Sequence, residues 1–125
     1  MTQRYFGSWS GWESMRECWR DGYGATATYP DIPPDAAILF ASYGGAAYEG
    51  DALVIFEQDG QLYEVHGGHC SCYGLEGQWT PEQTSWAALA MRERRIPGKY
   101  YHYLSDHDRE AQDAYWTLVD ARAAE

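Results

Sequence analysis

The chain has 125 residues, 9 basic against 19 acidic side chains, a formal net charge of −10 and 45% hydrophobic residues. This length suits one domain spanning residues 1–125, and the supply of large apolar side chains excludes a chain that is disordered throughout. The acidic balance argues against direct binding to nucleic acid through a basic face. The longest apolar runs, at 36–41 and 52–56, are far too short to cross a bilayer, so no membrane partner is expected.

The first residues and the cysteines indicate a compartment. Residues 1–8 contain no apolar segment typical of a secretory signal. The cysteines are odd in number, so they cannot all pair internally. We therefore expect a cytoplasmic protein in which Cys18, Cys70 and Cys72 are thiols or metal ligands.

A short helix is predicted near the N-terminus. Ser10 followed by Glu13 matches a capping box, in which each side chain bonds a backbone amide of the first turn. The spacing of the next large apolar residues predicts one buried stripe, made by Trp12, Met15 and Trp19. Gly22 and Gly24 are expected to end the helix, and the proline-containing run 26–34 to form an extended connector.

The middle of the chain is predicted to form a small antiparallel sheet. Residues 38–43 have the pattern of one strand. Two more strands, 51–58 and 61–66, flank Asp59-Gly60, which is a strong signal for a hairpin with a two-residue turn.

This turn sets which residues of the hairpin face each other. It pairs Phe56 with Tyr63 and Val54 with Val65, and both pairs share a face with Ala52, which we expect to face the core. We expect the opposite face to be only partly covered, because it mixes apolar and polar positions: Leu53, Ile55, Leu62, Glu57, Glu64 and His66.

A helix is predicted directly after the sheet. Thr80 as N-cap, Pro81 at the first helical position and Gln83 as the capping-box side chain indicate its start. Its inner stripe is expected to be Trp86, Leu89 and Ala90. Cations in the last turn complement the helix dipole before Pro97-Gly98 ends the helix, and these are Arg92, Arg94 and Arg95.

A last helix is predicted from Ser105, with Asp108 completing its cap, to about Ala121. Its expected inner stripe is Ala111, Ala114, Tyr115, Leu118 and Ala121. The predicted fold class is therefore α+β, a small antiparallel sheet packed by an N-terminal helix and two C-terminal helices.

The whole net charge falls in the central part of the chain. Between Arg20 and Arg92 there is no Lys or Arg, and this stretch contains ten acidic residues: Asp21, Asp31, Asp35, Glu49, Asp51, Glu57, Asp59, Glu64, Glu76 and Glu82. Such a surface can serve solubility alone. It can also form a negative face that meets a basic partner, for example a nucleic-acid-binding protein whose site it occupies, because complementary fields speed encounter and select partners.

Reactive side chains crowd together only in the segment 66–74. It contains four potential metal ligands, and imidazole and thiolate are the donors that Zn²⁺ prefers: His66, His69, Cys70 and Cys72. Their Cys-x-Cys spacing is tighter than that of a standard zinc knuckle. A zinc site would therefore use some of these residues together with others brought in by the fold, such as Cys18, His102 or His107.

Two other interpretations of this segment stay open. Cys70 or Cys72 could be a nucleophile activated by His69 or His66, although the sequence shows no orienting acid and we assign no catalytic residue. Alternatively, both thiols are small buried groups and the glycines serve a turn, because free cysteine is among the most buried residue types.

The chain is rich in aromatic residues, with 11 Tyr and 6 Trp. Most are expected in the core, but several lie in or near glycine-rich loops. There, a large apolar ring that also carries a hydroxyl or N–H group suits an interface. Together with nearby carboxylates, they form the predicted binding set: Tyr43, Tyr48, Glu49, Glu57, Glu64, Tyr73, Glu76 and Trp79.

Several strings cover roughly the middle half of the chain: Phe40-Ala41-Ser42-Tyr43, Tyr48-Glu49-Gly50, Asp59-Gly60-Gln61-Leu62-Tyr63-Glu64-Val65, His69-Cys70-Ser71-Cys72-Tyr73-Gly74-Leu75-Glu76-Gly77-Gln78-Trp79 and Pro81-Glu82. In these strings the chain resembles a family of uncharacterised small proteins of tailed bacteriophages and prophages. The resemblance implies a phage origin. It carries no activity, catalytic residue or cofactor.

A phage origin favours binding to a host protein, because small acidic phage proteins often act in this way. We expect a protein that inhibits or redirects a host factor by surface contact rather than turnover, for example an anti-defence protein of the anti-CRISPR kind, in the cytoplasm of the infected bacterium. The alternatives are a zinc- or thiol-dependent activity centred on His69, Cys70 and Cys72, and a sponge that sequesters a small ligand between aromatic loops.

Overall fold

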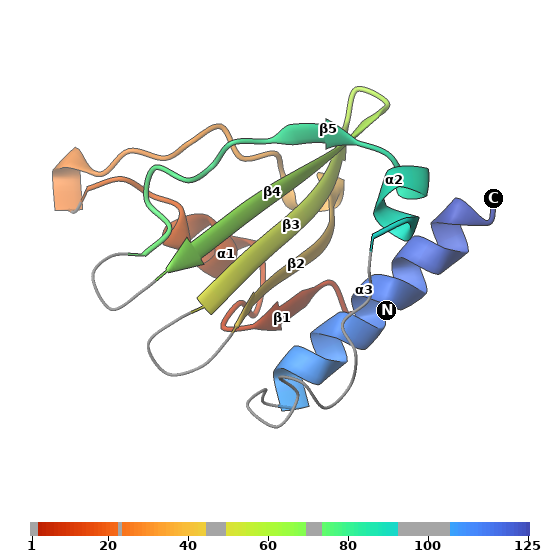
Figure 1. Ribbon diagram of the computed structural model, residues 1–125. Helices are drawn as coiled ribbons and strands as arrows, with labels where there is room; N and C mark the ends of the chain where they lie inside the picture. Colours follow the sequence, from red (N-terminus) through yellow and green to blue (C-terminus); the bar gives the residue numbers. More distant parts are fainter. Residues whose placement is uncertain (1–2, 23, 45–49, 70–73, 93–105) are drawn as a thin grey trace.

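The computed structural model describes residues 3–22, 24–44, 50–69, 74–92 and 106–125 (Figure 1). Its elements, in chain order, are β1 (Tyr5–Gly7), α1 (Trp12–Cys18), the 3₁₀ turns η1 (Gly24–Thr26) and η2 (Asp35–Ala37), β2 (Ile38–Gly44), β3 (Gly50–Gln58), β4 (Gln61–His69), β5 (Glu82–Thr84), α2 (Trp86–Ala90) and α3 (Asp106–Ala123). The strands form one sheet in the order β1-β2-β3-β4-β5, in which only the β1–β2 pair is parallel. The predicted α+β class is confirmed.

The hairpin of β3 and β4 has the register that the turn predicts. Phe56 faces Tyr63 and Val54 faces Val65. Asp59 and Gly60 have φ angles of 54° and 78°, the left-handed backbone that a tight turn of this hand requires at both positions.

Helix α1 lies on one face of the sheet and α2 and α3 lie on the other (Figure 1), and each face has its own core. On one face, Val54, Phe56 and Val65 pack with Met15 of α1 and with Trp19. On the other, Ile55 and Leu62 pack with side chains of α2 and α3. Glu57 and His66 of this second face remain exposed, so it is only partly covered, as expected.

The N-terminal segment differs from the prediction at both ends of its helix. The helix is capped at Gly11, where the Ser14 hydroxyl oxygen accepts bonds from the backbone N–H groups of Ser10 (2.9 Å) and Gly11 (3.2 Å), so the Ser10–Glu13 capping box is wrong. The helix ends at Cys18, before the glycines that were expected to end it. The cap shifts because the Ser14 hydroxyl, and not the Ser10–Glu13 pair, bonds the backbone N–H groups at the helix start. The helix ends early because Trp19, its C-cap, packs into the core.

Strand β1 was not predicted from the sequence. It pairs with the middle of β2, with Tyr5 opposite Ala41. The Tyr5 hydroxyl donates to the Asp35 carboxylate at 2.6 Å, and the Arg4 guanidinium bonds both oxygens of the same carboxylate. Pairing with β2, supported by these bonds to Asp35, therefore holds the segment extended.

The predicted helix start at Thr80 is wrong. Residues Glu82–Thr84 form β5 instead, because pairing with Leu62–Glu64 gives partners to the backbone groups at the open edge of β4. Helix α2 starts after Ser85, whose hydroxyl accepts from the Ala88 N–H at 3.1 Å. Helix α2 ends at Ala90, with Met91 as its C-cap, so the predicted end at Pro97-Gly98, with Arg92 in the last turn, is wrong. Arg94, Arg95 and Pro97-Gly98 themselves lie outside the described residues.

Helix α3 agrees with its predicted position and packs against β1, β2 and α2. Its most buried side chains are Ala111, Tyr115 and Val119, spaced by four residues, whereas Ala121, expected on the inner stripe, is exposed. In the described ranges of the chain, no helix has the length and apolar character needed to span a membrane.

Candidate functional site

The segment after β4 is tied to the sheet by one side chain. The Gln78 carboxamide accepts from the Gly68 N–H at 2.9 Å and donates to the carbonyls of Gly68 (2.8 Å) and Gly74 (2.7 Å). It thus bonds the end of β4 as a neighbouring strand would. It also joins the residues on either side of 69–73.

The residues around Gln78 pack onto the face of the sheet that α1 covers. Leu75 is fully buried, and the Trp79 ring lies edge-on to Trp19 at 5.2 Å and stacks on Phe56 at 5.9 Å. A Cβ on Gly67 would come within 2.9 Å of the Trp19 ring and 3.0 Å of Leu75, so this close packing requires glycine. The second half of the string His69–Trp79, which contains Leu75, Gln78 and Trp79, therefore has a structural role.

The opposite wall of the site comes from the end of α1. The Glu17 carboxylate accepts from the Tyr29 hydroxyl at 2.7 Å and from the Arg20 guanidinium at 2.9 Å. The Tyr29 hydrogen bond, helped by Arg20, holds the pKa of Glu17 below its ordinary value. Glu17 is therefore a fixed, ionised group at neutral pH.

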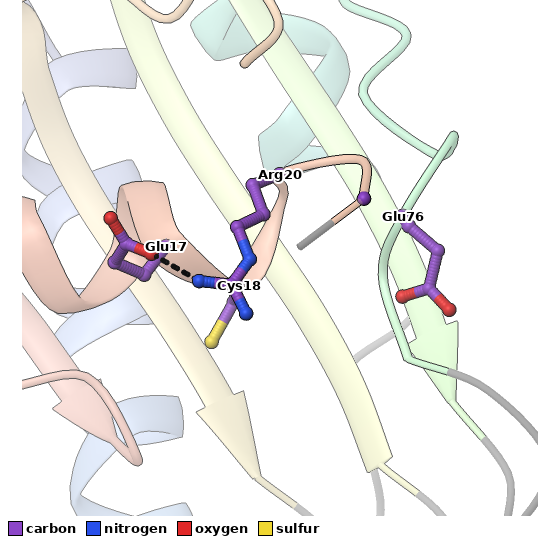
Figure 2. Close-up of a pocket in the computed structure, with 5 residues that line it drawn as sticks. Glu17, Cys18, Arg20 and Glu76 are labelled. Carbon is purple, nitrogen blue, oxygen red and sulfur yellow. Dashed lines mark hydrogen bonds and ion pairs between the residues drawn. The ribbon is translucent and has the colours of Figure 1, made fainter. Parts of the chain in front are cut away.

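A pocket of about 220 Å³ lies between these two walls (Figure 2). It is lined by Glu17, Cys18, Arg20, Gly22 and Glu76. Figure 2 shows Glu76, on the loop after β4, across from Arg20. The pocket therefore joins segments more than fifty residues apart in the chain, and no local spacing could have indicated it.

Tyr43 lies near this pocket. Burial raises the pKa of the Tyr43 phenol, and the nearby Cys18 and Glu76 raise it further. The Tyr43 ring packs at 5.2 Å from that of Trp9, so only part of it faces outward. The structure thus brings two predicted binding residues, Tyr43 and Glu76, to one place.

The remaining predicted binding residues are dispersed. Glu57 is exposed on β3, at the hairpin end of the sheet, and Trp79 is half-buried against Trp19 and Phe56. Tyr48, Glu49 and Tyr73 lie outside the described residues.

Among the acidic side chains that the structure describes, Glu64 is the exception, because it is only 4% exposed. The Arg92 guanidinium donates to both of its oxygens, at 2.6 and 2.7 Å, and His66 bonds one of them. The Tyr115 phenol of α3 lies close enough to the Arg92 guanidinium to affect its pKa, so the ion pair of β4 also lies against α3. The Glu64 carboxylate is engaged inside the fold and does not contribute to the exposed acidic surface.

The Glu64 carboxylate also determines which ring nitrogen of His66 carries the proton. Burial alone would raise the pKa of Glu64, but hydrogen bonds from His66, Arg92 and Thr84 outweigh it and hold the pKa below its ordinary value. An ionised carboxylate can only accept, so His66 Nε2 carries the proton that it donates. In the neutral ring, Nδ1 is then the nitrogen with the lone pair.

The predicted metal ligands lie mostly outside the described part of the chain. His66 is exposed on β4, whereas the side chain of His69 and residues Cys70 and Cys72 fall outside the described residues. Among the side chains that the structure does describe, no three His, Cys, Asp or Glu are placed to hold a metal ion.

Exposed carboxylates are distributed over several strands and loops of the described surface. Of the ten acids between Arg20 and Arg92, eight are exposed: Asp21, Asp31, Asp35, Asp51, Glu57, Asp59, Glu76 and Glu82. Comparison of the chain with family models, curated proteins and solved structures gave no match.

Proposed function

We propose that the chain is a small phage-encoded binding protein that inhibits or redirects a host protein by surface contact. The observation that carries the proposal is the exposure of eight carboxylates, one of which (Asp35) is paired with Arg4, in a stretch that contains no Lys or Arg. A partner with a basic face, such as a nucleic-acid-binding protein or a defence complex, complements this charge. The phage setting and the anti-defence role rest on the resemblance of the middle strings.

Reversing one exposed charge tests this proposal. In Glu57→Lys, the capture of a bacterial host partner by the tagged protein is expected to weaken, because a repulsive pair replaces an attractive one at the interface. The captured protein is first identified by mass spectrometry. Its association rate is then measured with purified components at low and high salt, and we expect a decrease of about tenfold at low salt.

A matched control distinguishes a specific face from net charge. Asp113→Lys makes the same charge change on an exposed position of α3, outside the acidic stretch, and is expected to leave the association rate nearly unchanged. Equal rates for wild type and Glu57→Lys would contradict a contact through this part of the surface.

A zinc- or thiol-dependent activity at His66, His69, Cys70 and Cys72 is the second candidate. Two observations favour it. The buried Glu64 orients His66 through Nε2, which is the usual support of a metal-binding imidazole. Gln78 also ties Gly68 to Gly74, on either side of the other three residues, which limits the entropy lost on forming a site.

Metal content tests the zinc site of the second candidate. If zinc is bound, elemental analysis of the untagged protein is expected to find it in stoichiometric amount, with thiols that become countable only after metal removal or denaturation. The variant Cys70→Ser/Cys72→Ser is then expected to lose the metal. Absence of metal, with all thiols reactive in the folded protein, would contradict the zinc site.

A further inference from the structure

The pocket between α1 and the loop after β4 has the size of one side-chain end. Its volume of about 220 Å³ is roughly seven times the volume per molecule of liquid water. It lies below the range of about 300–1,000 Å³ that is usual for small-molecule sites. The pocket therefore suits a group presented by another protein better than a free cofactor.

The charges around the pocket favour a cation. The described residues that line the pocket carry one net negative charge, because Arg20 is bonded to Glu17 and Glu76 is a second carboxylate. The Arg16 guanidinium, whose charge also acts on Glu17, lies outside this lining, over the Tyr29 ring. Within the described part of the chain, the Glu76 carboxylate accepts one hydrogen bond, from the Gly74 N–H at 3.3 Å, so it keeps acceptor capacity for a donor in the pocket.

The surface next to the pocket is ordered and has the composition of an interface. The Arg16 guanidinium lies 3.7 Å from the centre of the Tyr29 ring and 5.6 Å from that of Trp12. The Trp12 indole donates to the Pro33 carbonyl at 2.8 Å, and Tyr29 continues the network to Glu17 in the pocket. Trp, Tyr and Arg are the residue types that dominate binding energy in protein interfaces.

We propose that this pocket receives an arginine side chain of the partner protein, with its guanidinium donating to Glu76 and its neighbouring residues resting on Trp12 and Tyr29. This inference rests on the proposed function and names the chemistry of its contact. The bonds of Glu17 and Gln78 hold both walls in place before binding, so little order has to be imposed when the side chain enters.

A blocked Gly-Arg-Gly peptide tests the inference by NMR titration of the full chain. The backbone amide signals of Cys18, Gly22 and Glu76 are expected to shift in a saturable way. The same peptide with citrulline, which is neutral and of nearly identical shape, is expected to shift them far less. Glu76→Gln should weaken arginine-peptide binding about threefold to fivefold, as expected for one partly exposed ion pair. Glu82→Gln, which removes an exposed charge on β5, should leave it unchanged.

Equal shifts with arginine and citrulline, shifts spread evenly over distant acids such as Glu57 and Glu82, or no shift at all would each overturn the inference. These results leave the proposed function standing, because capture of the host protein and its sensitivity to Glu57→Lys are measured separately. Conversely, the pocket could bind the arginine peptide while the protein captures no host partner. That result would contradict the proposed function, but it would leave the specificity of the pocket for arginine intact.

Discussion

Replacing Arg92 by methionine is expected to lower the free energy of unfolding by about 3 kcal/mol, because the substitution leaves a buried carboxylate without its main positive partner. We place the effect at the low end for a broken buried pair, since His66 still bonds Glu64 and the Arg92 side chain itself is 42% exposed. Urea denaturation of wild type and variant at neutral pH measures the difference.

Two further variants separate the buried pair from ordinary effects of removing an arginine. Arg20→Met removes a pair with Glu17 that is exposed on both sides, and is expected to cost less than about 1 kcal/mol. Glu64→Leu/Arg92→Met removes both charges and is expected to recover much of the loss. If Arg92→Met and Arg20→Met were equally stable, the carboxylate would not depend on Arg92.

The same pair predicts how stability depends on pH. Although burial raises the pKa of Glu64, its hydrogen bonds hold the folded value below the ordinary 4.5. The ionised form therefore contributes stability that is complete above pH 4.5 and is lost as the pH falls through the lower, folded value. The stability difference between wild type and Glu64→Gln should shrink over that acid range. A difference that stayed constant there would contradict the assignment.

Gly7→Ala is expected to destabilise the protein by roughly 2–4 kcal/mol, from strain and a steric clash together. Gly7 has a φ of 70°, and a Cβ there would lie 2.2 Å from the carbonyl oxygen of Tyr43. That carbonyl accepts the Ser8 N–H at 2.9 Å, so relief of the clash has to disturb the junction of β1 and β2. Thermal or urea unfolding measures the loss.

Gly60→Ala is the matched control, because Gly60 also has a positive φ, 78°, but a Cβ there meets nothing within 4 Å. We expect this variant to lose about 1 kcal/mol from backbone strain alone. The larger loss of stability in Gly7→Ala than in Gly60→Ala is then the effect of the Cβ contact with the Tyr43 carbonyl oxygen. Similar losses for the two variants would show that the contact is relieved without cost.

The parts of the fold that were predicted correctly have local causes. The hairpin follows from Asp59-Gly60, because a two-residue turn needs left-handed backbone at both positions and then imposes the register of Val54 and Val65. The position of α3 follows in the same way from its periodic apolar residues.

Two errors, the missed strand β1 and the helix start at Thr80, arose where a distant partner outweighed a local signal. Thr80-Pro81 has the chemistry of a helix start, yet Glu82–Thr84 pairs with β4 because the edge of the sheet offers backbone hydrogen bonds. Strand β1 forms because Tyr5–Gly7 pair with Ala41–Tyr43 of β2 and bury Tyr5 and Phe6, and Arg4 and Tyr5 also bond Asp35. Both outcomes depend on contacts between residues eighteen or more positions apart, which local propensity does not represent.

The sequence by itself determined the fold class, the central hairpin and the excess of acid between Arg20 and Arg92, because these depend on near neighbours and on composition. Only the tertiary structure decided that Glu64 is buried against Arg92 while most of its acidic neighbours are exposed, and that Glu76 meets Arg20 and Cys18 across a pocket. The physical reason is that charge is a property of a residue, whereas its burial and its partner are set by segments that pack together from distant parts of the chain.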